Sequence, residues 1–313
     1  MKVLFVDHIF HLKTHSADFF LDILREAFEV ETFYYENTYR FKIPQKIIDG
    51  ADIIIFWEFL YNRRELGIPE KRCIFVPMYD NEWGSKWQWK RIAASGMPVI
   101  SFCDAITRHA KAQGVRDILD IRYLPNPADC PQANGDAKRV FLWERGEINE
   151  PEARRILPSD AGFCFDVKKA NEFLGKQEYL ERLAKSEIVI APRCKEGIGM
   201  AFLEAMAMGK CVVAHDDATM NEYIKDGETG ILIDFRKPAK LITANDVSVV
   251  RRNIAAAANK AHARWLTDKE KINSFVESVV DLPPLRRVTI SDSFRYALFI
   301  IEGLMQRIGL LDR

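Results

Sequence analysis

The first part of the chain alternates short apolar runs with stretches of helical periodicity. The apolar runs have strand length and are rich in β-branched and aromatic residues: Val3–Val6, Val30–Tyr35, Ile53–Trp57, Cys73–Pro77 and Val99–Cys103. Apolar residues recur with helical spacing at His15–Phe28 and Ala105–Gly114. Strands that alternate with helices predict a parallel sheet whose strands are joined by crossover helices.

This alternation is interrupted once and then starts again. Prolines and turn-forming polar residues crowd at Tyr123–Pro131 and Asn134–Asp136. The later strand candidates are Arg139–Trp143, Gly162–Val167, Ile188–Ala191, Cys211–Ala214 and Ile231–Ile233, and the helical stretches are Glu178–Lys185, Met200–Met208 and Asn221–Lys225. We therefore predict two α/β domains, at residues 1–127 and 128–282.

The end of the chain is predicted to be helical throughout. The pattern after Asn245 is helical up to Asp281, breaks at Pro283–Pro284 and resumes at Ser291–Ile308. A chain of 313 residues is long enough for two such domains and a helical tail.

Composition narrows the class of protein. Lys+Arg 45 balances Asp+Glu 45, so the chain lacks the basic footprint of a general nucleic-acid binder. Its six cysteines form no C-x-x-C pair, which argues against a zinc site or a disulfide framework. No apolar run approaches the roughly 18 residues that span a bilayer, and we expect a cytoplasmic protein.

The helix predicted at Met200–Met208 contains one charged residue, Glu204, among apolar ones. A helix that is apolar all round is buried. A buried carboxylate is unfavourable unless it is paired, so Glu204 needs either a protein donor or a ligand hydroxyl.

A second carboxylate, Glu196, lies on the other side of the loop that contains Gly197 and Gly199. Between the two carboxylates a helix begins, and its free N–H groups favour an anion. Glycines let a ligand approach the backbone. An anion with a hydroxyl-binding carboxylate on either side is the pattern expected for a nucleotide sugar.

Two other interpretations fit the same residues. The glutamates can be one surface side chain and one core side chain paired with an arginine. Alternatively, Gly197-x-Gly199 after a strand suggests a dinucleotide-binding fold. Against the second, Phe202 occupies the third glycine position and five residues separate the strand from Gly197.

The spacing Glu196-x7-Glu204 resembles the Glu-x7-Glu signature of retaining GT-B glycosyltransferases, the large group like glycosyltransferase family 4. The resemblance continues through Glu204–Ala214 and Asn221–Ile233, and back over Phe173–Ile190. It implies two facing Rossmann-like domains with parallel sheets, the donor held by the C-terminal one. It also implies that a helix in residues 283–313 returns to the N-terminal domain.

The resemblance implies roles for particular residues. Glu196 would contact the donor sugar, Glu204 the ribose, and Arg145 the diphosphate. The donor-binding set is Lys195, Gly197, Ile198, Gly199, Met200 and Glu204, with Glu196 and Arg145 catalytic. The lysine that the family carries shortly after the arginine is replaced by Glu150–Pro151, and Lys195, Arg154 and Arg155 are the candidates for its role.

The acceptor side is less defined. Where many family members carry a histidine, this chain has Met78-Tyr79-Asp80, and three histidines share the segment after the first strand. We expect Tyr79, Asp80 and His15 on the acceptor side. The tryptophan-rich segment Asp80–Arg91 either contacts a membrane interface, where it meets a lipid-linked acceptor, or packs as an ordinary helix.

The resulting hypothesis is sugar transfer from a nucleotide sugar to a glycan or lipid-linked acceptor, in bacterial envelope assembly. The resemblance implies retention at the anomeric carbon. No Asp-x-Asp occurs in the chain, and we expect no metal and no cofactor. We expect cytoplasmic location, peripheral to the inner face of the membrane. The alternatives are a catalytically inactive nucleotide-sugar-binding protein and an NAD-dependent oxidoreductase.

Overall fold

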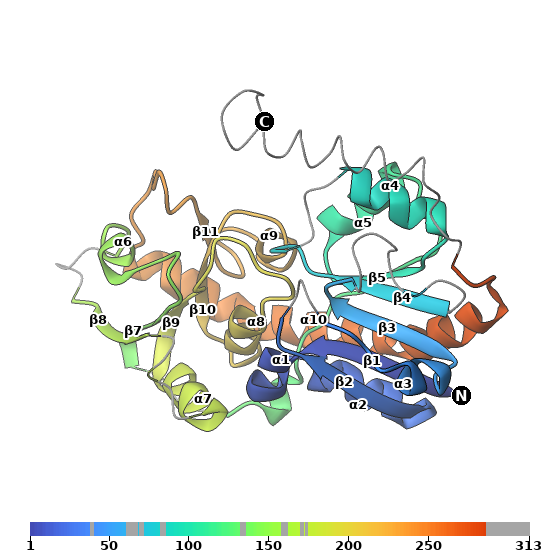
Figure 1. The fold of residues 1–313 in the computed structure, drawn as a ribbon. Coiled ribbons are helices and arrows are strands. Elements are labelled where there is room, and N and C mark those ends of the chain that lie inside the picture. Colours follow the sequence, from blue (N-terminus) through green and yellow to red (C-terminus); the bar gives the residue numbers. More distant parts are fainter. Residues whose placement is uncertain are drawn as a thin grey trace.

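The computed structural model describes residues 1–37, 41–60, 68, 72–81, 86–131, 136–157, 162–169, 172 and 175–285. Two parallel sheets lie side by side, each with helices against it (Figure 1). This is the predicted arrangement of two Rossmann-like α/β domains.

The N-terminal sheet has six strands in the order β2-β1-β3-β4-β5-β6. Every recorded pair is parallel, and the inner strands have continuous buried apolar runs, such as Val3–Val6 and Ile53–Trp57, because both faces of the sheet are covered. The strands are β1 (Lys2–His8), β2 (Glu29–Tyr35), β3 (Ile53–Glu58), β4 (Arg72–Pro77), β5 (Val99–Ser101) and β6 (Ile118–Asp120). The helices are α1 (Ile9–Thr14), α2 (Asp18–Ala27), α3 (Gln45–Asp49), α4 (Lys86–Ser95) and α5 (Asp104–Ala112).

The C-terminal sheet has five parallel strands in the order β11-β10-β9-β7-β8. They are β7 (Asp136–Glu144), β8 (Cys164–Lys169), β9 (Ser186–Ile190), β10 (Cys211–His215) and β11 (Ile231–Ile233). The helices are α6 (Glu150–Arg154), α7 (Lys176–Lys185), α8 (Met200–Ala207) and α9 (Met220–Tyr223). The 3-10 turn η1 (Pro127–Asp129), whose N-cap side chain is Asn126, lies at the predicted domain boundary.

A single long helix, α10 (Ala244–Ser278), joins the two halves. A capping box of Thr243 and Asp246 starts it. It packs first on α8 and β10 and then on α2 and β6, and in the view of Figure 1 it passes behind both sheets. Near its end Asn273 Nδ2 donates to Ile23 O at 3.0 Å. The larger hydrophobic core is therefore continuous through both domains.

This return of the chain to the N-terminal sheet comes before residue 283. The chain continues through the 3-10 turn η3 (Val279–Asp281), and Leu285 is buried in the N-terminal core. The helix predicted at Ser291–Ile308, and most of the tail 283–313, lie outside the described residues.

Local differences from the sequence expectations have simple causes. The segment after β1 contains the short helix α1, because His8 caps it by accepting from Phe10 N. Trp89 of α4 is buried against Phe75, as expected of an ordinary packing helix. Trp83 and the side chain of Trp87 lie outside the described residues.

Candidate functional site

The loop between β9 and α8 meets the N-terminal domain at the carboxyl ends of its strands. In this loop Glu196 is 6% exposed, and burial raises the pKa of its carboxyl to about 7. Arg193 and Arg145 oppose that rise, whereas Asp80 and Glu147 add to it. Glu196 is therefore a buried carboxyl group among charged side chains, and its pKa is close to neutral pH.

One arginine bridges the two domains beside Glu196. Arg193 Nη1 contacts Asp80 Oδ2 at 2.6 Å, and its Nε contacts Glu147 Oε1 at 3.2 Å. The other oxygen of Glu147 accepts from Cys194 N at 2.8 Å. Asp80 Oδ1 is buried and has no hydrogen-bond partner among the described residues.

The glycines of this loop are required by packing in this structure. A Cβ at Gly197 would lie 2.9 Å from Met78 Cβ and 3.0 Å from Asp80 Oδ1. Gly199 has φ +83°, and a Cβ there would lie 2.0 Å from the Phe202 ring. Gly197 thus permits close contact between the domains; its contact with a ligand stays a prediction.

Glu204 has one oxygen paired and one without a partner. It is 6% exposed on α8, and its Oε1 forms an ion pair with the ammonium of Lys176, which starts α7. Its Oε2 is buried with no hydrogen-bond partner in the described part of the chain. Burial raises the pKa of Glu204, and Lys176 and Tyr179 oppose that rise. Lys176 is therefore a protein donor to Glu204, one of the two kinds of partner expected from the sequence.

Arg145 is a cation at the same junction with no carboxylate in contact among the described residues. Its guanidinium lies 4.8 Å from the Trp143 ring centroid and 6.0 Å from that of Phe10 in the N-terminal domain. No side chain caps the nearby N-terminus of α8. Both features suit an anionic ligand.

The N-terminal domain contributes a second group of ionisable side chains. His11 Nδ1 lies 2.6 Å from Asp7 Oδ1, and His11 Nε2 lies 3.4 Å from Glu58 Oε2. Asn81 donates to the other oxygen of Glu58. Burial raises the pKa of Asp7, and it raises that of Glu58 to about 7.

Most of the residues predicted for the site meet at this junction. Tyr79 donates to Asp217 Oδ1 at 2.9 Å, and the Lys195 ammonium lies 5.9 Å from the Tyr79 ring. His15 instead forms a solvent-exposed pair with Asp18. Sequence reasoning did not single out Asp7, Glu58, Glu147, Lys176 and Arg193, and it treated His11 only as one of three histidines after the first strand. The spacing of four residues between Asp7, near the end of β1, and His11 could have indicated their contact.

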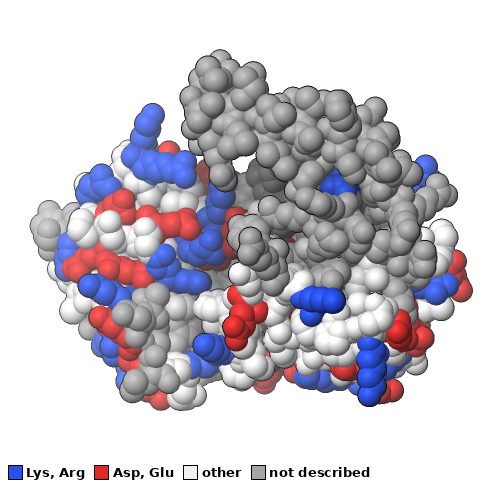
Figure 2. All heavy atoms as spheres, in the orientation of Figure 1, with Lys and Arg blue, Asp and Glu red and all other residues white. Residues whose placement is uncertain are grey.

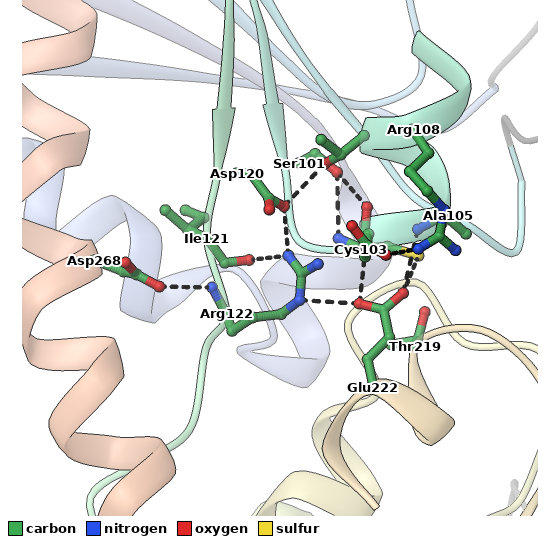
Figure 3. A network of polar contacts seen from close by, with 12 residues as sticks. Ser101, Cys103, Ala105, Arg108, Asp120, Ile121, Arg122, Thr219, Glu222 and Asp268 are labelled. Carbon is green, nitrogen blue, oxygen red and sulfur yellow. Dashed lines mark hydrogen bonds and ion pairs between the residues drawn. The ribbon is translucent and has the colours of Figure 1, made fainter. Parts of the chain in front are cut away.

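A different junction, which we call the latch, joins the domains through Arg122, Glu222 and Asp268 (Figure 3). Glu222 Oε2 accepts from Asp104 N at 2.8 Å and from Arg122 Nε at 2.9 Å, so a residue of α9 caps the N-terminus of α5. Arg122 also reaches Asp120 at 2.6 Å, and its backbone N–H donates to Asp268 at 3.2 Å.

Surface and metal-binding features add little to this picture. Figure 2 shows acidic and basic side chains interspersed on the described part of one face. Among the described residues, no group of three or more His, Cys, Asp or Glu side chains is arranged to hold a metal ion. Over the same residues, no helix is long and apolar enough to cross a membrane.

The fold belongs to the GT-B class, with two facing Rossmann-like domains. The chain is similar to the crystal structure of AviGT4, a glycosyltransferase involved in avilamycin A biosynthesis, at a TM-score of 0.56 and 12% identity, covering 91% of this chain and 99% of that one. It is also similar to Anabaena HepE in complex with UDP and glucose, at a TM-score of 0.53 and 15% identity, covering 89% and 100%.

The sequence matches a family model and several relatives, each over part of its length. Residues 146–246 match the family model described as "Glycosyl transferases group 1". The chain is 28% identical over 241 residues to the GDP-mannose-dependent alpha-(1-6)-phosphatidylinositol monomannoside mannosyltransferase of Mycobacterium tuberculosis, covering 61% of this chain and 63% of that protein. It is 28% identical over 96 residues to the D-inositol 3-phosphate glycosyltransferase of Geodermatophilus obscurus, covering 31% and 21%. The chain thus spans from about a fifth to under two thirds of these relatives.

Proposed function

We propose that the protein is a glycosyltransferase that moves a sugar from a nucleoside-diphosphate sugar to a hydroxyl acceptor. The observation that carries the proposal is the pair of buried carboxylates, Glu196 and Glu204, at the two ends of a stretch that contains the N-terminus of α8. Burial of both carboxylates is unfavourable in the free protein. Hydroxyl donors from a bound ligand would remove that disadvantage.

Each group at the site has a role in this reaction. Charge builds up on the diphosphate as its bond to the anomeric carbon breaks, and preorganised donors stabilise it. Arg145, which has no competing carboxylate in contact within the described chain, and the uncapped N-terminus of α8 are placed to do so. The free oxygen of Glu204 accepts from ribose, and Glu196 accepts from the donor sugar.

The finer features of the proposal come from the resemblance to the Glu-x7-Glu glycosyltransferases. We propose retention at the anomeric carbon and transfer without a metal, in line with the absence of Asp-x-Asp from the sequence. The acceptor is a glycan or a lipid-linked one. The relative named for phosphatidylinositol monomannoside supports a role in envelope glycolipid assembly.

A thermal-shift panel tests the donor site. UDP, GDP, ADP, CMP and NAD are each added with and without Mg²⁺ to the wild type and to Glu204→Gln. A ligand at about 100 times its Kd stabilises by roughly 2.7 kcal/mol, a shift of a few degrees. We expect one nucleoside diphosphate to stabilise the wild type without metal, and Glu204→Gln to lose most of that shift.

The matched control is Glu181→Gln, an exposed glutamate on α7 that should keep the full shift. Stabilisation by NAD alone would point to an oxidoreductase. Nucleotide binding without any turnover of the matching sugar nucleotide would identify an inactive binding protein. No shift with any of the five compounds would contradict the proposal.

A further inference from the structure

Thr219, in the segment between β10 and α9, has an unusual backbone conformation. Its φ is +73° and its ψ is −61°, and the residue is fully buried. Three non-glycine residues of the described chain have a positive φ, and Thr219 is the β-branched residue among them. A β-branched residue with positive φ is a true outlier, and such strain persists only where the surroundings hold the residue in place.

The hydroxyl of Thr219 shows what holds this residue in place. Thr219 is the N-cap residue of α9, yet its side chain makes no capping hydrogen bond. A threonine at this position usually caps the helix through its hydroxyl. Here the hydroxyl donates instead to the backbone carbonyl of Glu196 at 2.8 Å, and to that of Gly197 at 3.4 Å. The side chain thus holds the stretch of backbone that carries Glu196.

Residues on either side of Thr219 contact the N-terminal domain. Before it, Asp217 accepts a hydrogen bond from the Tyr79 hydroxyl at 2.9 Å. After it, Glu222 accepts from Asp104 N at 2.8 Å in the latch, and Figure 3 shows Thr219 beside Glu222. Tyr79 and Asp104 both belong to the N-terminal domain. Thr219 therefore lies between two interdomain contacts of one short segment.

We propose that Thr219 is a positioning residue of the donor site, which fixes the backbone of Glu196 relative to the contacts between the domains. The inference rests on the proposed transferase function, in which Glu196 contacts the donor sugar. Thr219 touches neither the sugar nor the diphosphate and acts through Glu196. Asp217 and Glu222 place the segment against the N-terminal domain, and the Thr219 hydroxyl transmits that placement to the sugar-binding carboxylate.

Loss of this hydroxyl should affect the reaction more than the binding of a nucleotide. Glu204 lies on α8 and Arg145 follows β7, so the groups proposed for the ribose and the diphosphate do not depend on Thr219. Misplacement by about 1 Å of a group that orients the reacting centre can lower the rate about a hundredfold. A residue needed only for folding would instead lower the amount of folded protein, without a selective loss of kcat per folded molecule.

The test measures hydrolysis of UDP-glucose and GDP-mannose, their transfer to glycerol and myo-inositol, and the thermal shifts with UDP and GDP. We expect Thr219→Ala to lose about ten- to a hundredfold in kcat on the sugar nucleotide that the wild type uses. Its thermal shift with the matching diphosphate should be unchanged. Thr219→Ser keeps the hydroxyl and should recover most of kcat. Thr219→Gly replaces Thr219→Ala if the latter does not fold, because glycine adopts a positive φ without strain.

Tyr79→Phe tests the link to the N-terminal domain. The substitution removes the hydroxyl that donates to Asp217 and keeps the ring. Effects of residues in one hydrogen-bonded network are not additive. We therefore expect Tyr79→Phe to lower kcat in the wild-type background and to lower it by a smaller factor in Thr219→Ala.

The matched control is Thr267→Ala. Thr267 is exposed on α10, and its hydroxyl also donates to a backbone carbonyl, that of Ala263 at 3.5 Å. This variant should keep the wild-type kcat and thermal shift.

Three results would overturn the inference and leave the donor site standing. They are wild-type kcat in Thr219→Ala or Thr219→Gly, an equal loss of kcat in Thr219→Ser, and fully independent effects of Tyr79→Phe and Thr219→Ala. Nucleotide binding by the wild type without hydrolysis or transfer would also overturn it, since the protein would then be an inactive binding protein. Absence of nucleotide binding by the wild type removes the proposed function and the inference together.

Discussion

The two domains meet at two junctions whose polar groups are satisfied to very different degrees. At the latch, both oxygens of Glu222 accept hydrogen bonds, and Arg122 donates to three acceptors. At the candidate site, three carboxylates each keep one buried oxygen without a hydrogen-bond partner among the described residues. These oxygens are Asp7 Oδ2, Asp80 Oδ1 and Glu204 Oε2.

The difference separates the junction that holds the domains together from the junction proposed to bind a ligand. A satisfied buried network is rigid and favours one geometry, whereas an unsatisfied buried oxygen destabilises the free protein. We therefore expect loss of a latch carboxylate to lower the free energy of unfolding. Loss of a site carboxylate should raise stability while it removes function.

The largest expected effect is that of Glu222→Ala at the latch. The substitution leaves Arg122, which is 9% exposed in its side chain, without its partner across the domains. Removal of one member of a buried pair costs about 3–5 kcal/mol. We expect a loss of that size in the free energy of unfolding, measured by chemical denaturation at pH 7.

Glu228→Ala is the control for the latch, since Glu228 pairs with Lys225 on the surface and should change stability little. Equal stability of Glu222→Ala and Glu228→Ala would show that the latch does not hold the domains together. The proposed difference between the two junctions would then be wrong.

Glu196→Gln should change the stability in the opposite direction, by raising the free energy of unfolding. Its carboxyl has a pKa of about 7 in the folded protein, against an ordinary 4.5. The folded state therefore binds more protons between these values, and wild-type stability falls as pH rises from about 4.5 to 7. We expect Glu196→Gln to match the wild type near pH 4 and to exceed it by on the order of 2–3 kcal/mol at pH 8.

The measurement is chemical denaturation at pH 4, 6 and 8, together with sugar-nucleotide turnover. Loss of turnover with a gain in stability at pH 8 would support the view that the site carboxylates serve function at the expense of stability. A variant that is less stable than the wild type at pH 8 would mean that Glu196 has a structural partner.

Those parts of the molecule that depend on local pattern were predictable from the sequence. The alternation of strands and helices identified both sheets, as the structure confirms, and the single charge in an apolar helix identified Glu204 as a buried carboxylate. β6 was not predicted because it is three residues long and only half-buried, so it has no apolar run. α1 was not predicted because six residues are too few to show the hydrophobic periodicity of a helix.

The contacts across the domains could not be predicted in the same way. Arg193 reaches Asp80 over 113 positions of sequence, and Glu222 caps a helix 118 positions earlier. Neither residue differs locally from an ordinary surface arginine or glutamate. Their roles arise only when α10 fixes how the two sheets face each other.

Of these substitutions, Lys176→Met should change the stability least, and it concerns the candidate site alone. Lys176 is the protein partner of Glu204, but its side chain is 37% exposed, so solvent already weakens the pair. We expect a loss of about 1 kcal/mol in the free energy of unfolding at pH 8. Lys185→Met, at the exposed far end of α7, is the control and should leave stability unchanged.

The pH dependence decides whether the loss comes from the carboxylate. Burial already raises the pKa of Glu204, and removal of Lys176 raises it further. Below the ordinary pKa of 4.5 the carboxyl is protonated in both the folded and the unfolded state, so variant and wild type should there be equally stable. The difference in stability between the wild type and Lys176→Met should appear as pH rises through the folded-state pKa of Glu204. A loss of stability of equal size at pH 4 and pH 8 would instead come from lost packing of the aliphatic part of Lys176. Glu204 would then gain no electrostatic stabilisation from a partner, whether protein or ligand.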